Sequence, residues 1–120
     1  MKSKEFTLEA SKRKKSAQGG DCFVAAGRNM IESDIPGMKL VHAYVTGQRA
    51  VAGKRFTHAW NEVGDVVIDK SNGRNIVLRK EFYYDLGNVV TQPGQYAVYD
   101  RKQMDEKLLD TETWGPRDLK

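Results

Sequence analysis

The first long apolar segment of the chain, residues 22–31, has hydrophobic side chains on more than one face of a helical projection. This pattern predicts a mostly buried helix. Asp21 stands immediately before the segment, where an N-cap residue is expected. Residues 33–37 should end the helix, because Pro36 disfavours the helical conformation of the residue before it.

Segments after the helix are rich in β-branched and aromatic residues, which predicts strands. The predicted strands are residues 39–46, 55–63, 66–69, 75–79 and 95–99. Two turn signals flank the third strand, namely the Gly64-Asp65 pair and the Ser71-Asn72-Gly73 sequence. The first signal predicts a tight hairpin between the second and third strands.

Two further helical segments are expected near the end of the chain. Residues 80–86 predict a helical turn that ends at Gly87, and its three aromatic residues either line a substrate groove or anchor a terminal segment to the core. Asp100 and Gln103 have the spacing of a capping box, which predicts a final helix through about Leu109. Strands in short succession without regular helical crossovers indicate an α+β domain with a mainly antiparallel sheet.

The composition is that of one globular domain: 120 residues, 39% hydrophobic and 30% charged. We expect this domain to span residues 18–120, after a basic N-terminal arm of residues 1–17. The net charge of +4 belongs to the arm, since residues 1–15 hold six Lys and Arg against two acidic residues. The remaining charges balance, so binding of nucleic acid is not expected except through the arm.

The sequence also argues against a membrane protein and against an exported protein. No apolar run approaches the roughly 18 residues of a membrane span. The polar, basic start also lacks the apolar region of a signal peptide. The sequence therefore predicts a cytoplasmic protein without membrane association.

Cys22 is the single cysteine, which excludes an intramolecular disulfide and a multi-cysteine zinc site. No tight ligand spacing is present, so neither a metal nor a cofactor is expected. A lone cysteine is most often an inert core residue. Cys22, however, falls in the first turn of the predicted helix, where unsatisfied N–H groups and a partial positive charge stabilise the nucleophilic thiolate.

His58 and Asp69 can be placed relative to each other from the predicted hairpin. If Gly64-Asp65 is a two-residue turn, Trp60 lies opposite Asp69, and side-chain alternation puts His58 and Asp69 on one face. As diagonal neighbours they are close enough for a hydrogen bond between imidazole and carboxylate. Such a bond fixes one tautomer and leaves the other ring nitrogen for a thiol. Ser71, directly opposite His58, is the alternative orienting residue.

The sequence HAWNEV at residues 58–63, followed by VIDKSNG at residues 67–73, resembles a conserved block of transglutaminase-like domains. Its family counterpart reads His-Ala-Trp-x-Glu-Val and then Asp-Pro-Ser/Thr-Asn-Gly. Those domains belong to the papain-like superfamily, whose core packs a helix bearing a cysteine on a sheet bearing histidine and Asp or Asn. The resemblance covers about half of the chain. It departs from the family at Lys70, which replaces the usual proline, and in the shorter spacing between histidine and aspartate.

The resemblance implies a role for each member of a Cys-His-Asp triad. Cys22 carries over as the nucleophile, His58 as the general base and acid, and Asp69 as the residue that orients His58. Papain-like proteases often place a glutamine shortly before the cysteine to assist the oxyanion hole. Gln18 is the candidate for that role, although its distance from Cys22 along the chain is short.

Three other residues near the predicted hairpin have more than one interpretation. Trp60 is either a lid over the His–Asp pair that lines a substrate groove, or a core residue. Glu62 shares the face of His58 and is expected to be solvated. His42 lies in a predicted strand and is expected to be a packed or surface residue instead of a catalytic one.

We therefore interpret the sequence as a thiol-dependent acyl-transfer enzyme of the cysteine peptidase, amidase or glutamine deamidase type. The expected partner is a peptide or protein substrate, attacked at a peptide bond or a glutamine side chain. Two alternatives stay open. One is a catalytically silent binding or effector module of the same fold, because a small domain leaves little wall for a deep groove. The other is a nucleic-acid-associated protein that acts through the basic arm.

Overall fold

The computed structural model describes residues 20–47 and 52–120 of the chain. Its elements are α1 (Gly20–Ser33), β1 (Lys39–Thr46), β2 (Arg55–Val63), β3 (Val66–Asp69), the 3-10 turn η4 (Ser71–Gly73), β4 (Ile76–Arg79), α2 (Lys80–Gly87), β5 (Tyr96–Tyr99) and α3 (Arg101–Thr111). These elements confirm the α+β class and the predicted order of helices and strands. The expected arm, the domain boundary after residue 17 and Gln18 lie outside the described residues.

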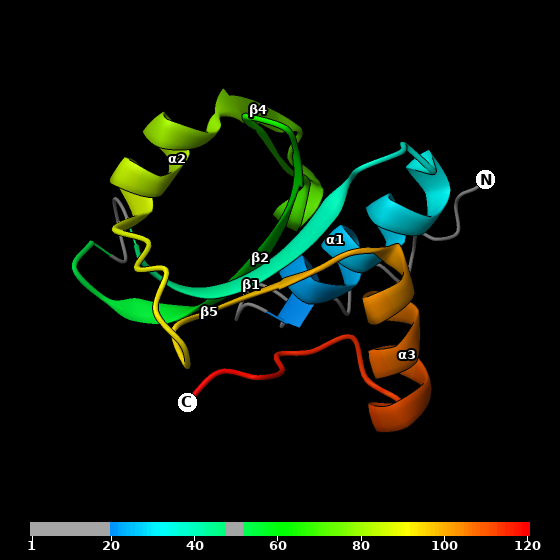
Figure 1. The fold of residues 1–120 in the computed structure, drawn as a ribbon. Coiled ribbons are helices and arrows are strands. Elements are labelled where there is room, and N and C mark those ends of the chain that lie inside the picture. The colour runs from blue at the N-terminus through cyan, green and yellow to red at the C-terminus, as the bar shows by residue number, and fades with distance from the viewer. Residues whose placement is uncertain (1–19, 48–51) are drawn as a thin grey trace.

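The five strands form one antiparallel sheet in the order β4-β3-β2-β1-β5. The sheet is strongly curved, with α2 on one side and with α1 and α3 on the other (Figure 1). None of the helices in the described part of the chain has the length and apolar character needed to span a membrane.

Side chains alternate between the two faces of the sheet, and each face has its own core. The core on the side of α1 and α3 includes Cys22, Phe23, Ala26, Leu40, Ala59, Tyr99 and Met104. The core on the side of α2 is Val41, Ala43, Val45, Trp60 and Val67, with Tyr83 and Tyr84 packed against it. Strand β2 therefore contributes alternate residues to two different helical layers.

Buried amide groups fix α1 on the sheet. The side chain of Asn61 in β2 donates from Nδ2 to the backbone carbonyl of Ala26 at 3.0 Å. Asn29 in turn donates from its own Nδ2 to Oδ1 of Asn61 at 2.9 Å, and Ser33 Oγ donates to Oδ1 of Asn29 at 2.9 Å. Polar groups buried in this way favour one position of the helix as well as stabilising the fold, because any shift of the helix leaves them without partners. These side-chain hydrogen bonds therefore fix the position of α1 on the sheet, and with it the position of its first turn.

The C-terminal segment closes the same face of the sheet. Helix α3 begins with the predicted capping box, in which the backbone N–H of Gln103 donates to Asp100 and the Asp100 N–H donates to the Gln103 side chain. Beyond α3, the ring of Trp114 occupies the space that a Cβ atom on Gly27 would need, at 2.3 Å from the nearest ring carbon. Helix α1 is thus held between the sheet and the chain terminus.

Candidate active site

The hairpin between β2 and β3 has the predicted register. Its pairs are Val63 with Val66, Glu62 with Val67 and Asn61 with Ile68. Gly64 starts the turn with a φ of 59°, in the left-handed region that glycine adopts without steric cost. His58 and Asp69 consequently face the same side, and Nε2 of His58 lies 3.0 Å from Oδ2 of Asp69. The predicted hydrogen bond between the two side chains is confirmed.

The Asp69 carboxylate is buried and accepts four hydrogen bonds. Besides His58, the Tyr83 hydroxyl donates to Oδ2 at 2.5 Å. The other oxygen, Oδ1, accepts from the backbone N–H of Ser71 at 2.9 Å and from its Oγ at 2.7 Å. Ser71, expected as an alternative partner of His58, therefore holds Asp69 instead.

Cys22 is brought to His58 by the start of α1. The β2–β3 ladder runs only as far as Asn61, and after Asp69 the chain turns into η4. There the backbone N–H of Asn72 donates to Oδ2 of Asp21 at 2.8 Å. Asp21 was expected as the N-cap, but the helix already includes Gly20, and the Asp21 carboxylate binds η4 instead. The first helical turn is thereby tied to the end of β3.

The imidazole of His58 lies between Cys22 and Asp69, with hydrogen bonds to both side chains. Because Nε2 is occupied by Asp69, Nδ1 is the nitrogen that remains for the thiol. Burial disfavours the charged ring, but hydrogen bonding and electrostatic interaction with Asp69 and Cys22 raise the pKa of His58 to about 9. The site therefore favours the charged, imidazolium form of His58 at neutral pH.

The charge of Asp69 is stabilised in the same way. Burial alone would raise the pKa of this carboxyl group, but the hydrogen bond and positive charge of His58, together with the hydroxyls of Tyr83 and Ser71, hold the pKa well below its usual range. Asp69 is thus ionised wherever the protein is folded near neutral pH. A carboxylate in this state orients the imidazole and compensates its charge.

The structure places Trp60 in the core, one of its two expected positions, and shows that the expectation of a solvated Glu62 was wrong. Trp60 is 0% exposed, so it packs in the core beside His58 at a ring separation of 6.0 Å and does not line an open groove. Its Nε1 donates to Oε2 of Glu62 at 2.9 Å. Glu62 is only 4% exposed and is not solvated, because Lys80 and the Tyr84 hydroxyl also bind its carboxylate.

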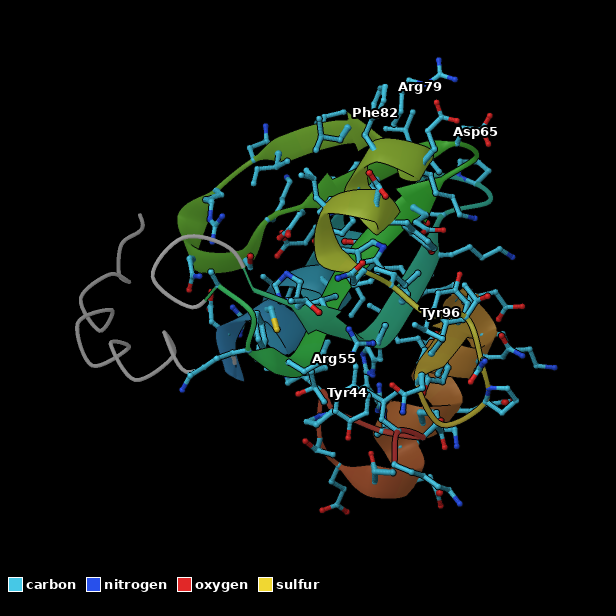
Figure 2. The ribbon with its side chains drawn as sticks, turned by 90° about the vertical axis from the view of Figure 1, so that its left-hand side faces the viewer. Tyr44, Arg55, Asp65, Arg79, Phe82 and Tyr96 are labelled. Carbon is cyan, nitrogen blue, oxygen red and sulfur yellow. The ribbon has the colours of Figure 1, made fainter. Side chains whose placement is uncertain are left out.

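The three aromatic residues of α2 have separate positions. Phe82 projects outward, near Arg79, and is 56% exposed (Figure 2). Tyr83 and Tyr84 turn inward, and their hydroxyls donate to the buried carboxylates of Asp69 and Glu62. Sequence reasoning recognised this cluster as a groove or an anchor but missed the hydrogen bond to Asp69.

His42 belongs to the opposite face of the sheet and is remote from this chemistry. Its ring packs edge-on against Phe23 and Tyr99, at centroid distances of 4.9 and 5.2 Å. Burial, aided by the charge of Arg117 and opposed by that of Asp118, lowers the pKa of His42 to about 3. His42 is therefore a packed residue, one of the two placements expected for it.

In the part of the chain that the structure describes, no group of three or more His, Cys, Asp or Glu side chains is arranged to hold a metal ion. Comparison of the chain with protein-family models, curated proteins and solved structures finds no match. Fold and site alone define the class: an α+β protein whose antiparallel sheet carries a His–Asp pair beside a helix-borne cysteine.

Proposed function

We propose that this chain is a thiol-dependent acyl-transfer enzyme with a papain-like or transglutaminase-like arrangement of Cys22, His58 and Asp69. One observation carries the proposal: the His58 imidazole is hydrogen-bonded to the Asp69 carboxylate on one side and to Cys22 on the other. A nucleophile, a base and an orienting group in this order are the elements of thiol catalysis.

The reaction follows from the charges of the site. The Cys22 thiolate forms a bond to the carbonyl carbon of a carboxamide. As the tetrahedral adduct collapses, the C–N bond breaks and His58 gives its Nδ1 proton to the leaving amine or ammonia. Water, or a second amine, then gives a proton to His58 and attacks the thioester, and the C–S bond breaks to restore the thiolate. Asp69 stays ionised throughout and holds the ring in place.

The negatively charged oxygen of the tetrahedral adduct needs hydrogen-bond donors to stabilise it. N–H groups at the start of a helix have no acceptor inside the helix, so the first turn of α1 is suited to supply one. Gln18 is the proposed second donor. The substrates that fit this chemistry are peptide bonds and glutamine side chains of peptides or proteins.

Alkylation of Cys22 by iodoacetamide tests the proposal without knowledge of the substrate. We expect the wild-type thiol to react at pH 6 roughly tenfold faster than the thiol of a His58→Ala variant, because His58 stabilises the reactive thiolate. Intact-mass spectrometry follows the reaction, since the chain has only one cysteine to modify. Equal rates in the two proteins at pH 6 would contradict the proposal.

The alternative of a catalytically silent binding module is favoured by a different observation, which is that Cys22 is only 2% exposed. A buried thiol is reached only if the structure around it opens. If Cys22 reacts with iodoacetamide in denaturant but not in the folded protein, the silent module is the better description. Fast reaction of the folded protein supports the enzyme.

A further inference from the structure

The two oxygens of the Asp69 carboxylate are held differently. Ser71, two residues after Asp69 at the end of β3, donates to Oδ1 from both its backbone N–H and its Oγ. Oδ2, the oxygen that faces His58, is shared with the hydroxyl of Tyr83, which comes from a separate helix. The orientation of Oδ2 therefore depends on the placement of α2.

Tyr83 is positioned for this contact by an aromatic row. Its ring lies 5.0 Å from that of Trp60, which lies 6.0 Å from that of His58. Burial and the nearby charge of Asp69 raise the pKa of Tyr83, so its hydroxyl keeps its proton and remains a donor across the neutral range. Because a neutral donor supports the charged form of a carboxylate, the contact helps to keep Asp69 ionised.

We propose that Tyr83 is a positioning residue of the candidate active site, and that its hydroxyl holds the Asp69 carboxylate in the orientation and ionised form that His58 requires. This inference rests on the proposed function. The charged and titratable groups around the pair are His58 from β2, Cys22 from α1 and Arg74, whose charge acts on Tyr83. Ser71 adds neutral donors to Asp69.

The adjacent residue offers a matched control. Tyr84 lies in the same helical turn and also donates its hydroxyl to a buried carboxylate, but that carboxylate belongs to Glu62. Tyr83→Phe and Tyr84→Phe each remove one hydroxyl and leave the ring. If Tyr83 only anchors α2, the two variants should affect the site alike, whereas a positioning role predicts different effects.

The test is a ¹³C NMR titration of the Asp69 carboxyl group in the wild type and both variants. Tyr83→Phe is expected to move the titration midpoint upward by about 1 pH unit, the value of one hydrogen bond to a charged group. Tyr84→Phe should leave the midpoint unchanged. The rate of Cys22 alkylation at pH 7 should fall roughly tenfold in Tyr83→Phe and stay within about twofold in Tyr84→Phe.

Two outcomes would overturn the inference: no change of the Asp69 midpoint in Tyr83→Phe, or the same change in both variants. A wild-type measurement gives an independent result, because a hydroxyl proton held by Asp69 should exchange slowly and be visible in the ¹H spectrum. Its absence would also count against Tyr83. If wild-type Cys22 reacts no faster than it does without His58, the proposed function fails, while the Asp69 midpoints still report on Tyr83.

Discussion

Asp69 and Glu62 show how neighbouring residues of the same face acquire different chemistry from their partners. Both carboxylates are buried, and each accepts a hydrogen bond from a tyrosine of α2. Asp69 is paired with an imidazole that is linked to a thiol, so in the proposed reaction its charge would orient that imidazole. Glu62 is paired with Lys80, at 3.4 Å, and with the indole of Trp60, so its charge stabilises the core.

We predict that Glu62→Gln lowers the free energy of unfolding by about 1–3 kcal/mol, because it weakens charge-assisted hydrogen bonds to buried partners. The matched control is Glu81→Gln. The Glu81 side chain is 67% exposed and lies 3.8 Å from Arg79, so this change should stay within about 0.5 kcal/mol. Urea denaturation followed by circular dichroism measures both. Equal effects would show that Glu62 is the solvated residue expected from its position in a strand.

At the residue scale, the His58–Asp69 pair could be predicted from the sequence, because a two-residue turn and strict side-chain alternation determine which residues meet. The burial of Glu62 and Trp60 could not be predicted in this way. Alternation gives a face, but it does not tell whether a helix covers that face. Only the return of α2 over the sheet makes Glu62 a buried charge, and the sequence of β2 does not encode that return.

At the element scale, α1 is the part of the fold that determines the position of Cys22. Its extent was predictable from the apolar pattern and from the Pro36 region that follows it. Its docking was not, because it depends on the buried Asn29–Asn61 pair, whose members are distant in the chain. A polar residue at an inward position of β2 was the available signal.

Asn61→Ala should therefore affect both stability and reactivity. Loss of the bonds to Ala26 and Asn29 leaves buried groups without partners, which should lower the free energy of unfolding by about 2–3 kcal/mol. The alkylation rate of Cys22 should fall roughly tenfold, because a small shift of the reacting groups is costly. Denaturation and intact-mass kinetics provide the measurements.

A control variant must show that a loss of stability alone does not reduce the alkylation rate of Cys22. Helix α3, which lies outside the candidate site, offers such a variant. Asp100→Ala removes the capping box of that helix and should cost about 1 kcal/mol. It lies outside the candidate site, so the alkylation rate should stay unchanged. Equal loss of reactivity in Asn61→Ala and Asp100→Ala would mean that general destabilisation, and not the docking of α1, controls Cys22.

At the scale of the whole molecule, the curved sheet separates two histidines into different environments. His58 faces α2 and is held between Asp69 and Cys22, whereas His42 faces α1 and the C-terminal segment and is fully buried. The Cβ position of Gly115 lies 2.6 Å from Cε1 of His42, so the terminal segment packs directly on this ring. The sequence could not predict this contact, since it joins β1 to a tail without regular structure.

The buried His42 makes the folded state sensitive to acid. Its pKa is lowered from 6.5 to about 3, so below pH 6.5 the unfolded chain binds a proton that the folded chain does not. The contribution of His42 to stability is therefore complete above pH 6.5 and should fall by up to about 1.4 kcal/mol per pH unit as the pH drops toward 3. Urea denaturation at pH 6.5 and 4.5 should show a smaller decrease in the free energy of unfolding for His42→Phe than for wild type.

Comparing the change of the free energy of unfolding with pH removes any difference in baseline stability between the two proteins. Carboxyl groups outside this contact contribute equally to both proteins. Parallel slopes would mean that His42 is protonated in the folded state, which its packing against Phe23, Tyr99 and the Arg117 charge opposes.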